Sequence, residues 1–259
     1  MKKISKVICI IFILLIIAFH AIPVCAAGKS YSWYCAHRKD NLQPVADKSI
    51  AFVEDYGGCY VDKAHGDECD DKVIYLTFDA GYENGNVEKI LDVLKQEKVT
   101  AAFFVLGGIL VKNTALVQRM FDEGHLVCNH TYSHKPMSNI DRSAFVAELE
   151  RLEKTCMEYT GKSLARYYRP PEGVFDEQSL QYAKDLGYKT VFWSFAYADW
   201  DNGKQMTPER AKQKILQNVH NGEIMLLHPT SQTNAIILQD VIRQLKSMGY
   251  RFASLDELA

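Results

Sequence analysis

The chain has 259 residues whose charges nearly balance: 30 lysines and arginines against 32 aspartates and glutamates give a formal net charge of −2 at pH 7. A clustered basic face is typical of nucleic-acid-binding proteins, so this balance argues against nucleic acid as a partner. Because 47% of the residues are hydrophobic, the chain can bury the core of one sizeable domain.

The first 26 residues have the pattern of an export signal. Lysines near the start precede an unbroken apolar run from Val7 to Phe19, and small residues follow at Val24-Cys25-Ala26. This pattern predicts a secretory signal peptide over residues 1–26, with a mature chain that begins at Ala27. An uncleaved segment that keeps the protein at the membrane is the alternative. Both interpretations place the protein outside the cytoplasm, in the cell wall or on the outer face of the membrane.

Residues 27–71 differ from the rest of the chain, because their aromatic and charged residues follow no regular period. We expect an N-terminal extension that wraps around the main domain. Five cysteines follow the export signal: Cys35, Cys59, Cys69, Cys128 and Cys156. Their odd number leaves at least one thiol free or paired between molecules. Cys59 and Cys69 lie close together in a polar segment, so we expect a disulfide between them.

From residue 72 onward, short apolar runs alternate with amphipathic segments. The expected strands are residues 73–78, 101–105, 126–128, 166–168, 190–193, 224–227 and 251–253. The expected helices are residues 87–96, 114–122, 143–159, 177–186, 208–218 and 236–248. This alternation predicts parallel strands with crossover helices. No Gly-x-Gly-x-x-Gly follows the first strand, which disfavours a dinucleotide-binding sheet and leaves a distorted (β/α) barrel over residues 72–259.

Helix boundaries support this division. Thr207 precedes Pro208, and Asp176 precedes the fourth helix, so both are predicted N-cap residues. Glycines stand where a left-handed residue ends a helix before the next strand: Gly124, Gly187 and Gly249.

Polar side chains that can carry chemistry follow the expected strands at their carboxyl ends. They are Asp79, His130, His134, Arg169, Asp199 and His228. Barrels of alternating strands and helices gather their catalytic groups at that end, so we expect these side chains to form one site.

The segment His130-Thr-Tyr-Ser-His134 indicates a metal site. Two imidazoles four residues apart can reach one ion through a helical turn or a tight loop. Zn²⁺ or another divalent ion suits imidazole ligands. Two ordinary loop histidines are the alternative.

Two carboxylate-containing pairs suit acid–base chemistry. Asp79 follows an apolar strand, where it can serve as a general base, and the Arg169 fork can hold its carboxylate. His228 can protonate a leaving amine, with Asp199 as a partner that raises its pKa. An ordinary turn aspartate before Gly81 and a surface arginine are the alternatives.

Five short motifs, in chain order, carry a family resemblance. They are Thr77-Phe-Asp-Ala-Gly81, His130-Thr-Tyr-Ser-His134, Arg169-Pro-Pro-Glu-Gly173, Asp199-Trp200 and Leu226-Leu-His228. Together they resemble the motifs of polysaccharide deacetylases, also called carbohydrate esterase family four or NodB-homology domains, over residues 72–258. The resemblance implies a distorted (β/α) barrel that removes acetyl groups from amino sugars.

The resemblance also implies a role for each motif residue. Asp79 would be the base, oriented by Arg169, and His228 the acid, tuned by Asp199. His130 and His134 would be the metal ligands. The remaining implied site residues line the substrate pocket: Trp200 and Leu226 would enclose the acetyl methyl group, and the backbone N–H of Glu172 would hold the oxyanion.

The sequence departs from the family at two positions. Ala80 stands where most members have a second aspartate that completes the metal site, so two histidines and water would remain to hold a divalent ion such as zinc. We therefore expect weak metal binding. Glu172 stands where an aromatic residue is usual.

One subgroup resembles the chain over longer stretches. Phe78–Gly85, Tyr197–Trp200 and Tyr31–Tyr34 are similar to segments of the δ-lactam-biosynthetic de-N-acetylases of spore-forming bacteria. This implies that the substrate is a peptidoglycan strand, deacetylated at a peptide-free N-acetylmuramic acid so that the amine can close a lactam in the spore cortex. One alternative is deacetylation of N-acetylglucosamine in peptidoglycan or chitin-like chains. Another is a non-catalytic glycan-binding module, against which the acid–base pairs argue.

Overall fold

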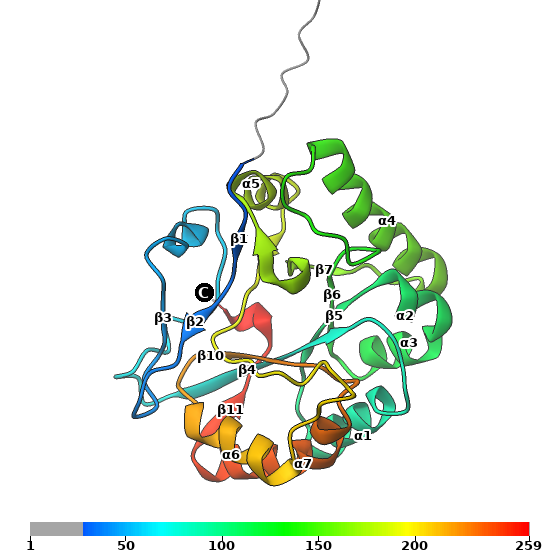
Figure 1. Cartoon of the computed structure of the whole chain (residues 1–259). Helices are drawn as coiled ribbons and strands as arrows, with labels where there is room; N and C mark the ends of the chain where they lie inside the picture. Colours follow the sequence, from blue (N-terminus) through cyan, green and yellow to red (C-terminus); the bar gives the residue numbers. More distant parts are fainter. Residues whose placement is uncertain (1–27, 259) are drawn as a thin grey trace, which may run out of the picture.

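The computed structural model of the protein describes residues 28–258 (Figure 1). The export signal predicted over residues 1–26, and with it the possible membrane segment and the mature start at Ala27, lies outside the described residues. Between residues 28 and 258, no helix combines the length and the apolar character that crossing a membrane requires.

A curled parallel sheet forms the centre of the molecule. Its strands are β4 (Lys72–Ala80), β5 (Ala102–Val105), β6 (Leu126–Asn129), β7 (Ala165–Tyr168), β9 (Lys189–Thr190), β10 (Glu223–Leu227) and β11 (Tyr250–Phe252). They lie in the order β10-β4-β5-β6-β7-β9, and β11 pairs with the first residues of β4. All seven expected strands are present.

The chain that follows β9 brings the two edges of the sheet together. The backbone N–H groups of Ser194 and Phe195 donate to the carbonyl of Ile224 in β10, at 3.0 and 3.3 Å. The N–H of Leu226 donates to the carbonyl of Phe195 at 2.8 Å. This irregular closure confirms the distorted barrel, and it explains why β9 is shorter than the strand expected over residues 190–193.

Helices pack around the outside of the sheet (Figure 1). They are α1 (Val87–Glu97), α2 (Gly107–Lys112), α3 (Thr114–Asp122), α4 (Arg142–Thr160), α5 (Glu177–Asp185), α6 (Pro208–Asn218) and α7 (Gln232–Ser247). The side chains of Asp176 and Thr207 cap α5 and α6 as expected. Helix α2 was not expected, because it is short and begins with two glycines, which disfavour helix.

The N-terminal extension contributes the short elements β1 (Tyr31–Ser32), β2 (Cys35–Ala36), β3 (Val45–Ala46) and η1 (Ala51–Glu54). Strand β1 pairs antiparallel with β8 (Val174–Phe175). The Trp33 ring stacks on Phe192 with 4.5 Å between ring centroids, and its Nε1–H donates to the carbonyl of Trp193 at 2.9 Å. The extension therefore buries Trp33 against the barrel.

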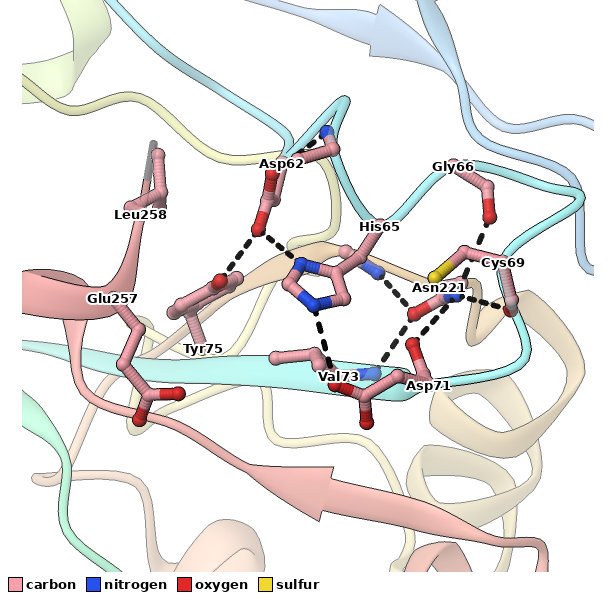
Figure 2. A network of polar contacts seen from close by, with 12 residues as sticks. Asp62, His65, Gly66, Cys69, Asp71, Val73, Tyr75, Asn221, Glu257 and Leu258 are labelled. Atoms are coloured by element: carbon pink, nitrogen blue, oxygen red, sulfur yellow. Dashed lines mark hydrogen bonds and ion pairs between the residues drawn. The ribbon is translucent and has the colours of Figure 1, made fainter.

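A polar network fastens the last part of the extension to the beginning of β4 (Figure 2). The buried carboxylate of Asp62 accepts hydrogen bonds from the Tyr75 hydroxyl at 2.5 Å and from His65 Nδ1 at 2.7 Å. The other ring nitrogen of His65 lies 3.3 Å from Asp71 Oδ2. Asn221 donates through Nδ2 to three carbonyls of this loop and accepts through Oδ1 from two backbone N–H groups.

The predicted disulfide between Cys59 and Cys69 is wrong, because all five cysteines between residues 28 and 258 are free thiols. The backbone of Cys59 is hydrogen-bonded to Thr190 and Phe192, beside β9. The carbonyl of Cys69 is instead held by Asn221 near the start of β4. The two cysteines are close in the sequence, but different parts of the barrel hold them.

Candidate active site

A cavity of about 730 Å³ opens at the carboxyl ends of the strands. Its walls include seven of the residues expected from the sequence: Asp79, His130, His134, Glu172, Trp200, Leu226 and His228. The other two expected residues, Arg169 and Asp199, are buried behind this wall and contact Asp79 and His228. The structure thus brings every expected site residue together.

Asp79 is the penultimate residue of β4 rather than the residue after the strand, because β4 continues through Ala80 beside Val105 of β5. The Arg169 guanidinium donates to Asp79 Oδ1 at 2.8 Å. It also donates to Thr77 Oγ1 at 3.0 Å and to two backbone carbonyls. Arg169 is fully buried, so these bonds fix the orientation of the Asp79 carboxylate.

The surroundings of Asp79 keep it ionised. Burial favours its neutral acid form, but the positive charge of Arg169, with smaller contributions from His130 and His228, outweighs burial and lowers the pKa of Asp79 below its ordinary value. A carboxylate that is ionised, oriented and open to a cavity can accept a proton from a bound water.

The two histidines of the expected metal site lie in a tight turn after β6. Their ring centroids are 5.0 Å apart. Thr131 and His134 both have left-handed backbone conformations, with φ of 70° and 57°. The Thr131 hydroxyl accepts from the backbone N–H of His134 at 3.0 Å, which stabilises this turn. The turn therefore presents both rings to one space.

His130 has the tautomer that a metal ligand needs. Its Nδ1 lies 2.8 Å from the carbonyl oxygen of Arg169, which can only accept, so Nδ1 carries the proton. The free lone pair is then on Nε2, 3.6 Å from Asp79 Oδ2. Burial lowers the pKa of His130 to about 4 despite the opposing charge of Asp79, so the ring is neutral at pH 7. A neutral imidazole oriented through its second nitrogen fits a divalent ion.

The donor set is nevertheless small. Residues 28–258 contain no group of three or more histidine, cysteine, aspartate or glutamate side chains arranged to hold a metal. Ala80 is fully buried and packs in the hydrophobic core. Two imidazoles alone would leave the remaining coordination positions of a bound ion to water or substrate.

Residues of α4 support the histidine turn, and no sequence motif indicates them. Glu148 accepts from the backbone N–H of Ser133 at 3.0 Å and from its hydroxyl at 2.8 Å. The Arg151 guanidinium lies over the Tyr132 ring, 3.7 Å from its centroid. A Cβ at Gly107 would lie 2.5 Å from that ring, so only glycine fits there.

His228 and Asp199 form a close pair. His228 Nδ1 lies 2.7 Å from Asp199 Oδ1, and the backbone N–H of His228 donates to Asp199 Oδ2 at 2.8 Å. Burial opposes protonation of the ring, but the hydrogen bond to Asp199 and its charge prevail and raise the pKa of His228 above its ordinary value. Nε2 remains available to give a proton to a group in the cavity.

The remaining wall residues shape the cavity. Trp200 is 60% exposed at its mouth, whereas Leu226 in β10 is buried. Glu172 has a left-handed backbone with φ of 57°. Tyr82 also lines the cavity and accepts a hydrogen bond from Asn202 Nδ2 at 3.2 Å. Sequence reasoning did not select Tyr82, although it directly follows the first motif.

Comparisons with known proteins agree with this geometry. The family model of polysaccharide deacetylases matches residues 66–191. The peptidoglycan-N-acetylmuramic acid deacetylase PdaA of Bacillus subtilis (strain 168) is 39% identical over 228 residues, which cover 88% of this chain and 85% of that protein. A peptidoglycan-N-acetylglucosamine deacetylase of Bacillus cereus is 32% identical over 194 residues, covering 73% of this chain and 88% of that protein.

The fold comparison leads to the same relatives. The structure of Bacillus subtilis PdaA, described as a family 4 carbohydrate esterase, superposes with a TM-score of 0.83 at 38% identity. The match covers 89% of this chain and 97% of that chain. Sequence and structure therefore point to one set of proteins.

Proposed function

Because the chain belongs to the polysaccharide deacetylase family, we propose that it removes the N-acetyl group from N-acetylmuramic acid residues of peptidoglycan. The enzymatic part of this proposal rests on one observation: a candidate general base, Asp79, and a candidate general acid, His228, line the same cavity. Arg169 favours the ionised form of Asp79, and Asp199 favours the protonated form of His228. The sugar specificity rests on the 39% identity to a relative with that activity.

The proposed reaction uses both pairs. Asp79 takes a proton from a water molecule, and the water oxygen forms a bond with the acetyl carbonyl carbon. The backbone N–H of Glu172 donates to the resulting oxyanion, while Trp200 and Leu226 enclose the methyl group. His228 then protonates the nitrogen as the C–N bond breaks, which releases acetate and leaves a free amine on the sugar.

A divalent ion such as Zn²⁺ is the proposed cofactor, held by His130 and His134. When bound, it would polarise the acetyl carbonyl. With Ala80 in place of a carboxylate ligand, we propose that the ion is held weakly.

We also propose where the reaction takes place. Peptidoglycan lies outside the cytoplasm, and the pattern of residues 1–26 favours export to the cell wall or the outer face of the membrane. A free muramic amine next to an unsubstituted lactyl carboxyl group is the precursor of a δ-lactam, so the proposed setting is synthesis of the spore cortex.

We expect the purified protein to release acetate from muropeptides that contain peptide-free N-acetylmuramic acid, and to release little from chitooligosaccharides. The measurement is an enzymatic acetate assay on both substrates, with Asp79→Asn protein as the control for background release. Release from chitooligosaccharides alone would favour N-acetylglucosamine as the substrate. Binding of either glycan with no acetate release would favour a non-catalytic module.

We expect metal removal to lower activity reversibly. Dialysis against a chelator should reduce acetate release, and added zinc should restore it. Because His134 is proposed as one of only two protein ligands, His134→Ala should weaken zinc affinity by at least ~10-fold, measured by titration calorimetry. His65→Ala is the matched control, since that histidine lies in the network at the beginning of β4. Full activity in a verified metal-free sample would instead make His130 and His134 substrate contacts.

A further inference from the structure

Asn234, in the first turn of α7, lies directly behind the His228–Asp199 pair. It is 1% exposed. Its Nδ2 donates to Asp199 Oδ2 at 2.6 Å and to the carbonyl of His228 at 3.1 Å. Its Oδ1 accepts from the hydroxyl of Tyr197, which fixes the orientation of the amide. Both polar atoms of this side chain are therefore hydrogen-bonded to the pair or to Tyr197.

The contact determines which way the Asp199 carboxylate faces. Oδ1 accepts from His228 Nδ1, whereas Oδ2 accepts from the backbone N–H of His228 and from Asn234. Without Asn234, Oδ2 would keep one donor, and the carboxylate group would be freer to rotate away from Nδ1. The hydrogen bond that sets the tautomer of His228 would then be less constantly formed.

The side chain of Asn234 is not needed to build α7. The helix is capped by Ser231, whose hydroxyl accepts from the backbone N–H of Asn234 at 3.1 Å. The helix packs on the barrel through apolar residues further along, such as Ile237, Leu238 and Val241. Substitution of the amide therefore changes the carboxylate contact more than the helix.

We propose that Asn234 is a positioning residue of the reaction, which holds Asp199 so that His228 presents Nε2 to the substrate nitrogen. This inference rests on the proposed function and assigns a residue to it that none of the five motifs contains. Asn234 acts through Asp199 and contacts no substrate.

The first test compares Asn234→Ala with Asn221→Ala. Asn221 is also a buried asparagine with hydrogen bonds to several backbone groups, but it lies at the beginning of β4 (Figure 2). We expect Asn234→Ala to lower kcat by about tenfold or more with little change in KM, because it weakens general acid catalysis. Asn221→Ala should lower the melting temperature and leave kcat unchanged. Equal kcat losses in the two folded variants would overturn the proposal.

The second test uses Asn234→Asp, which keeps the shape of the side chain. A protonated carboxyl group at this position can donate to Asp199 as the amide does, whereas an ionised one repels it. The charged and titratable groups that face the pair are Asp79, Arg169 and Tyr197. We expect the ratio of kcat of this variant to that of the wild type to fall as pH rises from about 5 to about 8. A ratio that does not depend on pH would indicate a merely structural asparagine.

A spectroscopic measurement separates this proposal from the proposed function. The Nδ1 proton of an imidazole bonded to a carboxylate gives a strongly downfield NMR resonance, which is seen without any substrate. The His65–Asp62 pair makes the same contact, so the His228 resonance is identified by its loss in His228→Ala. We expect the His228 resonance in the wild type and in Asn221→Ala, and its broadening or loss in Asn234→Ala. If the wild type released no acetate but this pattern held, the function would fail and the positioning would stand. An unchanged resonance in Asn234→Ala would contradict the positioning itself.

Discussion

Replacing Asp79 by asparagine is expected to lower kcat for acetate release by about 10²–10⁴-fold, the usual contribution of a general base. An amide cannot take a proton from water. Its oxygen can still accept from Arg169, which also keeps its bonds to Thr77 Oγ1 and to the backbone. The variant should therefore fold, and circular dichroism and thermal unfolding should be measured beside kcat.

The matched control is Asp92→Asn. Asp92 also pairs with an arginine, Arg119, at 2.6 Å, but on the exposed face of α1. This control should retain wild-type kcat, because exposed ion pairs contribute little and Asp92 lies outside the cavity. Near-normal turnover by folded Asp79→Asn protein would show that another group activates the water.

Replacing His228 by alanine is expected to lower kcat by about 10²–10⁴-fold on the natural amide, because the amine would leave without a proton. The loss should be much smaller on 4-nitrophenyl acetate, whose leaving group needs no proton. The pKa of His228 is raised, so its acid form persists above the ordinary value, and wild-type kcat should fall only as pH rises through the raised pKa. That limb should be absent from the variant.

His65→Ala is the control for this prediction. His65 bonds to Asp62 through Nδ1 at 2.7 Å, the same contact that His228 makes with Asp199, but in the network at the beginning of β4. Its kcat and pH profile should match the wild type. If His228→Ala kept the fall in kcat at high pH, a different group would be the acid.

Much of the fold was predictable because most helices of the barrel are amphipathic and its central strands are mostly buried. Helix α6 was expected at its observed bounds, since Thr207 and Pro208 mark its start. Helix α7 begins four residues before its expected start. Its first turn contains polar residues that hydrogen-bond to Asp199 and Gln205, so the apolar pattern that marks a helix begins only later. The closure of the barrel through Ser194 and Phe195 has no local pattern, since it depends on backbone hydrogen bonds alone.

The motif residues of the candidate site, including the partners Arg169 and Asp199, were predictable, whereas the supporting residues on helices were not. Asp79, His130 and His228 are polar residues at the carboxyl ends of apolar strands, and that contrast is visible in the sequence. Asn234 and Glu148 lie on helices, where polar residues usually face solvent. Only the packing of α4 and α7 against the barrel brings them to the histidine turn and to Asp199.

The position of Trp33 has a consequence for the order of folding. Its partners are Gly173, whose carbonyl accepts from the Trp33 N–H at 2.8 Å, together with Phe192 and Trp193. Contacts so distant along the chain form late, because a long loop must close first. Trp33 therefore stays exposed to solvent until the chain around residues 192 and 193 has folded beside it. The wall of the cavity at Gly173 is thus completed only when the N-terminal extension packs against the barrel.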